Sequence, residues 1–318
     1  MEKQFKKIGT HDGKFHADEV MATAILNEIF VTELIRTRNK KVLDELDIVY
    51  DVNGGEFDHH GIDKVMREDG TPFSSCGLIW NKFGKEVIRF KNESLDEDQI
   101  DEIFNFIDRS LVEGIDALDN GIWIDKPEIP LMNISSILSG FNPLWYEEDK
   151  ENQNFNKAVE FATSILNNKI NFKISVIKAK EKVVKAYESR EIPEVMMLDS
   201  YCPYGESLKE IDEAQQILFV IFKSKTNYLL QTIRGKDGKD KKKLPKDWMG
   251  KRDEELANVT GVSDATFCHT GRFIAGAVSL EGIKKLARLA IQEPYEHESI
   301  IDKIMKFTKK LFIKIIEV

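Results

Sequence analysis

The chain has 318 residues, of which 42% are hydrophobic and 32% are charged, and its formal net charge is −9. These totals are typical of a globular protein long enough for two domains, and they argue against broad electrostatic capture of duplex nucleic acid. The three widely spaced cysteines, Cys76, Cys202 and Cys268, argue against a disulfide framework and a zinc cluster. No apolar window is long enough for a membrane helix, and no apolar leader precedes the first predicted strand. We therefore expect a cytoplasmic protein without a transmembrane segment.

The first half of the chain alternates short strands with helices. The predicted strands are residues 6–11, 33–38 and 47–52, and the predicted helical regions are 17–30 and 74–121. This order is typical of an α/β domain with a mostly parallel sheet and helices on both faces. Ligands of such sheets bind at the carboxyl ends of the strands.

The second half predicts a long helix followed by a smaller α+β domain. A charged pattern without proline covers 151–190, and later elements are strands at 194–200, 215–223 and 227–234, a strand ending at His269, and a helix at 280–292. The strands at 215–223 and 227–234 are expected to pair as a hairpin. The predicted parts are a catalytic domain (1–150), a helical connector (151–192), an α+β domain (193–296) and an amphipathic helical tail (297–318).

The tail and one loop carry clustered lysines. The tail has apolar residues on one helical face, so it could lie on a membrane, but packing onto the protein or a second subunit is commoner. We therefore expect this helix to pack onto the protein itself or onto a second subunit, and the second arrangement would give a homo-oligomer. Residues 234–252 carry nine Lys or Arg against three Asp. A solvated loop is the usual reading of such a run, and the alternative is a patch in which Lys241, Lys242 and Lys243 steer phosphate.

Histidines and acids gather where the predicted strands end. Four of the six histidines belong to this group, whose members are His11, His16, Asp18, Asp51, Asp58, His59, His60, Asp116 and Asp119. Each residue alone has an ordinary explanation, as a turn, a cap or a hydrogen-bonded side chain. Together they are the donor types with which proteins hold pairs of divalent ions such as Mn²⁺ for phosphoryl displacement.

Residues 57–61, FDHHG, resemble the signature of the DHH phosphoesterase superfamily. The wider pattern is similar to the melanocyte-proliferating-gene family, from about Ile8 to Ile291. The segments that carry this resemblance are GTHDGKFHADEVMATAIL, IRTR, DIVYDVNGGEFDHH, SSCGLIW, DALDNG, NPLW, LPKDWMGKRDEEL and CHTGRFIAG. Members of the family are described as metal-dependent hydrolases that act as 3′-to-5′ RNA exonucleases. The resemblance therefore implies a DHH-like fold and a two-metal phosphodiesterase.

Matched by motif position, the resemblance implies a ligand set for two divalent ions, which we expect to be Mn²⁺. The ligands would be His11 and His16 for one ion, Asp18, His59 and Asp119 for the other, and Asp51 between them. Asp116 stays open as an alternative to Asp119. Asp58 would orient the histidines, and His60 would contact the scissile phosphate. The superfamily has an aspartate where this chain has His16, which makes the site less negative and the native metal an open question.

The second domain is expected to hold the substrate. CHTGRFIAG resembles the superfamily's short substrate-binding motif, which implies that His269, Gly271 and Arg272 contact the nucleic acid. Glycine lets backbone N–H groups approach phosphate, and arginine offers two parallel donors. We expect RNA or a short oligonucleotide as the substrate. The alternatives are a hydrolase of small phosphates (pyrophosphate, oligonucleotides or cyclic dinucleotides) and a binding module for nucleic acid or protein without turnover.

Overall fold

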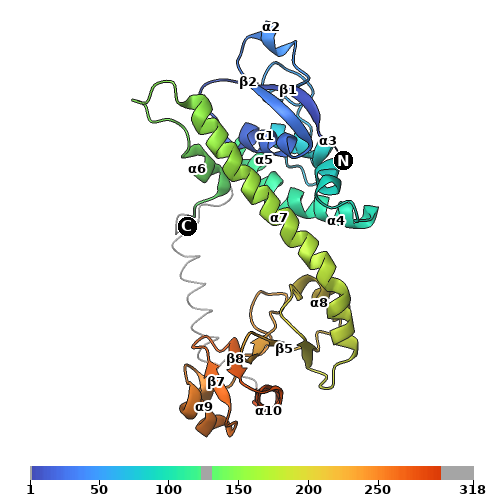
Figure 1. Ribbon diagram of the computed structural model, residues 1–318, viewed down its shortest axis with the longest axis vertical. Coiled ribbons are helices and arrows are strands. Elements are labelled where there is room, and N and C mark those ends of the chain that lie inside the picture. The colour runs from blue at the N-terminus through green and yellow to red at the C-terminus, as the bar shows by residue number, and fades with distance from the viewer. Residues whose placement is uncertain (1, 123–130, 295–318) are drawn as a thin grey trace, which may run out of the picture. The chain divides into compact units, whose positions relative to one another are not determined.

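The computed structural model describes residues 2–122 and 131–294 (Figure 1). The chain divides between Ile177 and Lys178 into two compact units. Helix α7, Glu151–Glu188, contains this boundary. The predicted amphipathic tail, 297–318, lies outside the described residues, so its role in an oligomer stays a prediction. The four-part division of the chain also stays a prediction.

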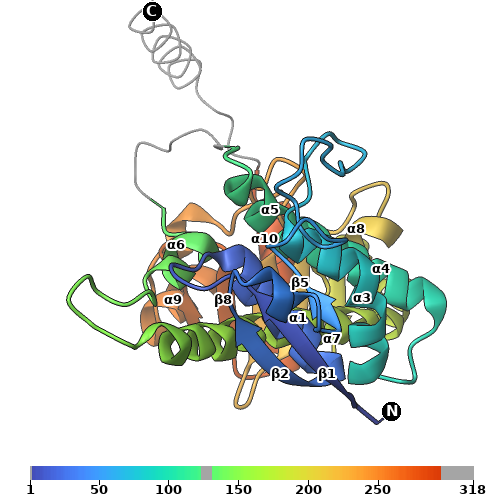
Figure 2. The same ribbon diagram turned by 90° about the horizontal axis from the view of Figure 1, so that it is seen from above.

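The first unit is built on a small parallel sheet. Its elements are β1 (Gln4–Thr10), α1 (Ala17–Ile29), β2 (Phe30–Arg36), α2 (Lys40–Leu43), β3 (Ile48–Val49), α3 (Ser75–Lys91), α4 (Glu97–Ile107), a π-helical turn (Asp108–Val112), α5 (Glu113–Asp119), α6 (Ile134–Ser139) and much of α7. The strand order is β2–β1–β3, with both pairs parallel. Figure 2 shows β1 and β2 side by side. The predicted α/β class and parallel sheet are confirmed.

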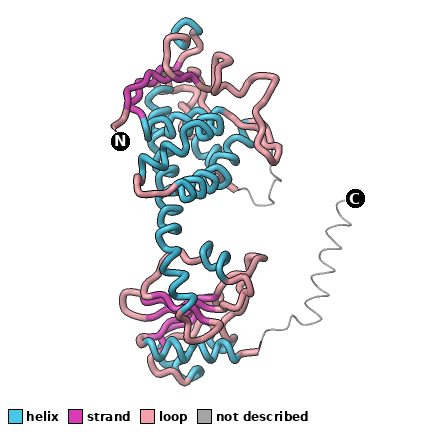
Figure 3. The backbone as a smooth tube through the Cα atoms, turned by 90° about the vertical axis from the view of Figure 1, so that its right-hand side faces the viewer, coloured by secondary structure: helices cyan, strands magenta, loops and turns pink. Residues whose placement is uncertain are grey.

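The helices of this unit gather mainly on one face of the sheet (Figure 3). Twelve of the 13 residues of α1 are buried, because this helix packs within the core and against α3. The other face carries the short helix α2 and the turn after it. Gly9 of β1 lies on that side, where an added Cβ would collide with Leu46 and crowd Leu43. Helices therefore lie on both faces, but very unequally.

Strand β3 is shorter than the predicted strand over 47–52. Asp51 has a φ of 60°, in the left-handed region that L-residues seldom adopt. Its backbone N–H donates to the carbonyl of Phe57, 3.1 Å away, so the chain turns at this point. The turn ends the strand and leaves Asp51 just beyond its carboxyl end.

The second unit has a five-stranded mixed sheet. Its elements after α7 are β4 (Val195–Leu198), α8 (Gly205–Ile211), β5 (Phe219–Lys223), β6 (Tyr228–Thr232), a 3₁₀ turn (Lys246–Trp248), α9 (Asp253–Thr260), β7 (Ala265–Cys268), β8 (Ile274–Ala277) and α10 (Leu280–Gln292). The strand order is β4–β5–β6–β8–β7, and only β4 and β5 are parallel. The smaller α+β domain and the β5–β6 hairpin are therefore confirmed.

Strand β5 is buried on both faces, as a central strand should be. Phe219 and Ile221 belong to the core that includes α10, whereas Val220 and Phe222 belong to the core that includes Val183 of α7. This alternation has the two-residue period of a strand between two layers. The end of α7 is thus part of the second unit's own core.

Two lysines of the lysine-rich segment 234–252 bind backbone carbonyl groups of the second unit. The Nζ of Lys241 donates to the carbonyl of Ile217 (3.0 Å) and lies 3.3 Å from Oδ2 of Asp212. The Nζ of Lys242 donates to the carbonyl of Ile291 (2.7 Å), and its side chain is buried. These contacts disfavour the alternative in which the two lysines steer phosphate, because each ammonium group is held by the fold. Lys243 is exposed.

Within residues 2–122 and 131–294, no helix has both the length and the apolar character that crossing a bilayer requires. The three cysteines are unpaired, and Cys76 and Cys268 are buried.

Candidate metal centre

The predicted metal-binding residues lie around one cleft of the first unit, with a volume of about 740 Å³. Those that line it are His11, His16, Asp51, His59 and Asp119, and His60, the predicted phosphate contact, lines it too. His11 directly follows β1 and Asp51 follows β3. Because β1 and β3 are parallel neighbours, their carboxyl ends meet at the same edge of the sheet.

His11 is buried between two carboxylates. Its Nε2 lies 3.1 Å from Oε1 of Glu19 and 3.3 Å from Oδ2 of Asp51, and its Nδ1 lies 2.8 Å from the carbonyl oxygen of Asp12. Burial alone would lower the pKa of His11, but the hydrogen bonds to Asp51 and Glu19 outweigh burial and raise it to about 10. A divalent cation could replace this proton between the same acids.

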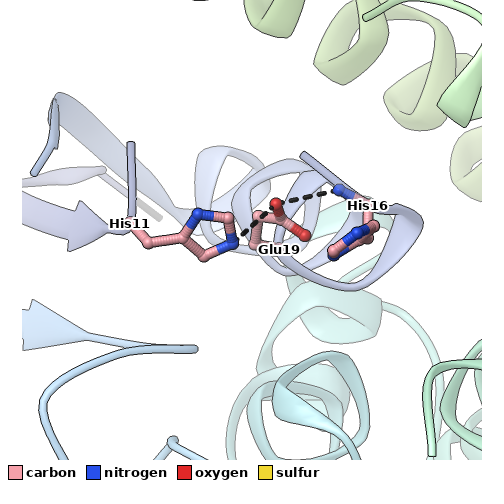
Figure 4. Close-up of side chains that lie close together, drawn as sticks. All are labelled: His11, His16 and Glu19. Carbon is pink, nitrogen blue, oxygen red and sulfur yellow. Dashed lines mark hydrogen bonds and ion pairs between the residues drawn. The ribbon is translucent and has the colours of Figure 1, made fainter. Parts of the chain in front are cut away.

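Glu19 is a site residue that the sequence reasoning missed. It is fully buried, and its Oε1 accepts a hydrogen bond from the backbone N–H of His16, 2.9 Å away. Figure 4 shows the carboxylate between His11 and His16. Its other oxygen, Oε2, is buried without a hydrogen-bond partner among the described residues. The signal in the sequence is the glutamate three residues after the helix N-cap His16, which is the spacing of a capping box.

Asp18, in the first turn of α1, is buried against the start of α3. Its Oδ1 accepts hydrogen bonds from the hydroxyl of Ser74 and from the backbone N–H of Cys76 (2.6 Å), and its Oδ2 accepts one from the N–H of Ser75 (3.2 Å). Burial first, and then the charges of Asp51 and Asp119, raise the pKa of Asp18 well above its ordinary value. Three carboxylates thus converge within a buried region.

The tandem histidines contact different acids. His59 places Nε2 3.1 Å from Oδ2 of Asp119 and Nδ1 3.6 Å from Oδ2 of Asp18. His60 places Nδ1 2.8 Å from Oδ1 of Asp58, and the two imidazole rings stack with their centroids 4.3 Å apart. Burial is the main cause that lowers the pKa of His59, which favours the neutral imidazole that can bind a metal.

Asp58 is fixed by the backbone of its own loop. Its Oδ2 accepts from the N–H of Gly54 (2.6 Å), and its Oδ1 accepts from the N–H of His60 (3.1 Å) as well as from the ring. Burial would raise the pKa of Asp58, but these hydrogen bonds lower it below its ordinary value. The carboxylate is therefore ionised and holds His60.

Asp116 and Asp119 have different environments. Asp116 is completely buried, with Oδ2 2.6 Å from Nη2 of Arg67 and with Oδ1 accepting from Ser74 (2.5 Å) and from the N–H of Gly77 (3.0 Å). A side chain on Gly77 would clash with this carboxylate. Burial raises the pKa of Asp116 to about 6. Asp119 instead lines the cleft, where burial and the charge of Asp51 raise its pKa to about 6.

These donors fit divalent cations. Three groups of side chains around the cleft bring one donor atom each to within 4.8 Å of one another: His11, His16 and Glu19; Asp51, His59 and His60; and Asp18, His59 and Asp119. Oδ1 of Asp51, like Oε2 of Glu19, is buried and lacks a hydrogen-bond partner among the described residues. Buried carboxylate oxygens without partners are costly, and a bound cation would satisfy them.

The predicted substrate-binding residues of the second unit lie in the turn between β7 and β8. The backbone N–H of Gly271 donates to Nδ1 of His269 (2.9 Å), and that ring lies 4.4 Å from the ring of Phe273. Arg272 has a φ of 58°, and its Nη1 donates to the carbonyl of Leu244 (3.3 Å). The turn is therefore tight, and His269 is exposed on it.

Comparisons with known proteins give matches over nearly the whole chain. The sequence model of the MYG1_exonuc family, described as an uncharacterised protein family (UPF0160), matches residues 7–291. The MYG1 protein C694.04c of Schizosaccharomyces pombe is 30% identical to this chain, and the alignment covers 91% of this chain and 98% of the yeast protein. The protein named MYG1 exonuclease from Rattus norvegicus is 30% identical, and the alignment covers 90% of this chain and 85% of the rat protein. The protein of the same name from Homo sapiens is 29% identical, and the alignment covers 90% of this chain and 86% of the human protein.

Among solved structures, RecJ from Thermus thermophilus in complex with Mg²⁺ matches with a TM-score of 0.28 and 12% sequence identity. The match covers 91% of this chain and 50% of the RecJ chain. A likeness this weak supports no conclusion about this chain.

Proposed function

We propose that this chain, which belongs to the MYG1_exonuc family, is a metal-dependent phosphodiesterase that removes nucleotides from the 3′ end of RNA. The observation that carries the proposal is the convergence of histidines and buried carboxylates on one cleft, with carboxylate oxygens that lack partners among the described residues. The rat and human relatives named MYG1 exonuclease support nuclease activity, and the family resemblance supports RNA as the substrate and the 3′-to-5′ direction.

The ligand set proposed for two divalent ions is the set expected from the sequence motifs, with Glu19 added. Its members are His11, His16, Asp18, Glu19, Asp51, His59 and Asp119. Imidazole and carboxylate together suit Mn²⁺, which we propose as the native metal. Divalent ions bound in such a site lower the pKa of a coordinated water and neutralise charge on phosphate oxygens.

The protein's own groups would orient and stabilise the substrate. His60 is exposed at the cleft, and its Nδ1 is fixed by the ionised Asp58. With Nδ1 bound to Asp58, the other ring nitrogen, Nε2, would contact an oxygen of the scissile phosphate as negative charge develops there. In the second unit, Arg272 and the backbone at Gly271 would bind a phosphate of the nucleotide chain, and His269 would assist them.

A second candidate function is hydrolysis of small phosphates, such as pyrophosphate, short oligonucleotides or cyclic dinucleotides. The cleft volume of about 740 Å³ lies in the range of small-molecule sites, and the net charge of −9 does not favour long polyanions. The same ligand set would serve both substrate classes, so only the substrate itself separates them.

One assay separates these functions. Protein freed of metal with EDTA and then supplied with Mn²⁺ is incubated with 5′-labelled RNA, the matching DNA, a dinucleotide, a cyclic dinucleotide and pyrophosphate. The proposal expects a ladder of RNAs that shorten from the 3′ end, and no ladder in EDTA or with the Asp51→Asn variant. A labelled mononucleotide as the first product would contradict the direction. Turnover of only the small phosphates would favour the second candidate, and no turnover of any substrate would refute both.

A further inference from the structure

The cleft that holds the candidate metal ligands is also lined by three cations. Lys14, Arg38 and Lys64 come from three different segments: the connection between β1 and α1, the residues after β2, and the loop after the tandem histidines. The chain as a whole carries a net charge of −9, so cations gathered at one cleft need a local explanation.

These cations have few anionic partners of their own. Nε of Arg38 lies 3.5 Å from Oδ1 of Asp12, with the two side chains 64% and 54% exposed, and such an exposed pair contributes little. Nζ of Lys64 donates to Oδ1 of Asn120 (2.5 Å), which is neutral. Lys14 forms no hydrogen bond or ion pair within residues 2–122 and 131–294. Most of this positive charge is therefore available to an anion in the cleft.

The backbone on both sides of Lys14 is held in place. The side-chain amide of Asn142 accepts from the N–H of Phe15 (2.9 Å) and donates to its carbonyl (2.7 Å). Nη2 of Arg36 donates to the carbonyl of Gly13 (2.7 Å). The backbone at Lys14 is thus held in place, and along the chain this residue lies between the two candidate ligands His11 and His16.

Lys64 belongs to a different segment of the same cleft. It lies four residues after His60 and lines the cleft together with His59 and His60. The cleft therefore combines acids and imidazoles that could bind metal ions with cations contributed by separate loops. This combination suits a substrate with more than one phosphate, because phosphate oxygens bind both divalent ions and Lys or Arg side chains.

We propose that Lys14, Arg38 and Lys64 form a subsite for a second phosphate group, next to the scissile phosphodiester. This inference rests on the proposed phosphodiesterase function. A phosphodiester carries one negative charge, which the bound ions and His60 would already meet. Three additional cations then select substrates that carry another phosphate, either in the nucleotide backbone or at the chain's terminus.

The test compares substrates that differ only in phosphate number: a dinucleotide with hydroxyl ends, the same dinucleotide with a 5′-phosphate, and a trinucleotide with hydroxyl ends. The quantity measured is the ratio of kcat/KM for each two-phosphate substrate to that for the one-phosphate dinucleotide. We expect the wild-type ratio to exceed about ten, and each of Lys14→Ala, Arg38→Ala and Lys64→Ala to lower it several-fold, since a typical hydrogen bond formed in exchange for one to water contributes about that much. The matched control is Lys41→Ala on α2, an exposed lysine outside the cleft, which should leave the ratio unchanged.

The outcomes separate the subsite from the function. A wild-type ratio near one, with the dinucleotide still hydrolysed, would refute the subsite and keep the phosphodiesterase. Equal losses on one- and two-phosphate substrates in the variants would also refute it. A high ratio for the phosphorylated dinucleotide alone identifies a terminal phosphate, and a high ratio for the trinucleotide identifies the backbone.

If no substrate is hydrolysed, equilibrium binding decides whether the subsite exists. The phosphorylated dinucleotide is bound to wild type and to the variant that carries all three substitutions. Equal affinity refutes the subsite, and weaker binding by the variant supports it.

Discussion

Nη2 of Arg67 lies 2.6 Å from Oδ2 of Asp116, and through this ion pair a buried network reaches the candidate ligand Asp18. Arg67 also binds Asp108, with Nε and Nη2 donating to its two carboxylate oxygens over 3.0 and 2.7 Å. The hydroxyl of Ser74 lies between Asp116 and Asp18 and contacts both. Asp116 therefore supports the cleft from behind, whereas Asp119 lines it, and this arrangement favours Asp119 as the ligand.

Ser74→Ala should weaken Mn²⁺ binding by about 10- to 100-fold, the usual effect of removing a hydrogen bond that orients a ligand. Without the hydroxyl, Asp18 and Asp116 lose the donor between them. The Mn²⁺ dissociation constant can be measured by calorimetry, and Ser74→Thr should restore it in part. The exposed Ser94→Ala is the matched control. An unchanged dissociation constant in Ser74→Ala would show that the network does not position Asp18.

Asp116 should make the folded state less stable as pH rises. Burial raises its pKa from the ordinary value of 3.8 to about 6, so the folded protein binds this proton more tightly than the unfolded chain. The contribution to stability is therefore complete below pH 3.8 and is lost as pH rises through about 6. Asp116→Asn lacks this titration, so its free energy of unfolding should gain about 2 kcal/mol relative to wild type between about pH 4.5 and 7. Urea unfolding of both proteins measures the difference, and a constant difference across that range would contradict the prediction.

Asp51→Ala and His59→Ala should each abolish turnover and reduce bound metal while the protein stays folded. Each variant removes a donor that faces the cleft, and neither side chain belongs to the hydrophobic core. Metal content by mass spectrometry and circular dichroism of the same samples test the two halves of this expectation. Asp63→Ala, an exposed acid in the neighbouring loop, should behave as wild type. Unchanged metal content and activity in both variants would show that the ligand assignment is wrong.

Glu19→Gln should lower Mn²⁺ affinity by at least about tenfold, because a neutral amide replaces a buried anion beside His11 and His16. The amide oxygen can still accept the N–H of His16, so the start of α1 should be kept. Calorimetric titration gives the affinity, and the far-ultraviolet spectrum checks the helix. The exposed Glu33→Gln on β2 serves as control. Equal affinity of Glu19→Gln and wild type would remove Glu19 from the site.

Activity should depend on a divalent ion and should be highest with Mn²⁺, and His16→Asp should change the choice of ion. A carboxylate at this position favours Mg²⁺ or Mn²⁺, whereas imidazole favours later transition metals such as Co²⁺, Ni²⁺ or Zn²⁺. Rates of the EDTA-treated proteins with each added ion give the order of preference. The same order in variant and wild type would mean that His16 is not a ligand, and full activity in EDTA would remove the metal from the function altogether.

The sequence by itself determined the local elements and the chemistry that the cleft could contain. Helix α1, the β5–β6 hairpin and helix α10 lie within a few residues of their predicted positions, because each depends on a repeating apolar pattern or a short turn. His11 and Asp51 could be expected to meet because parallel strands end at one edge. The assignment of each ligand stays a prediction that the variants above test.

Only the tertiary structure decided which polar groups are held and which are available. Arg67 and Asp116, or Asn142 and Phe15, are far apart along the chain, and no local pattern marks such pairs. For the same reason the sequence did not show that the fold binds the ammonium group of Lys241. A hydrogen bond or an ion pair depends on distances of a few ångströms between atoms, and those distances are set by how the whole unit packs, whereas periodicity depends only on neighbours along the chain.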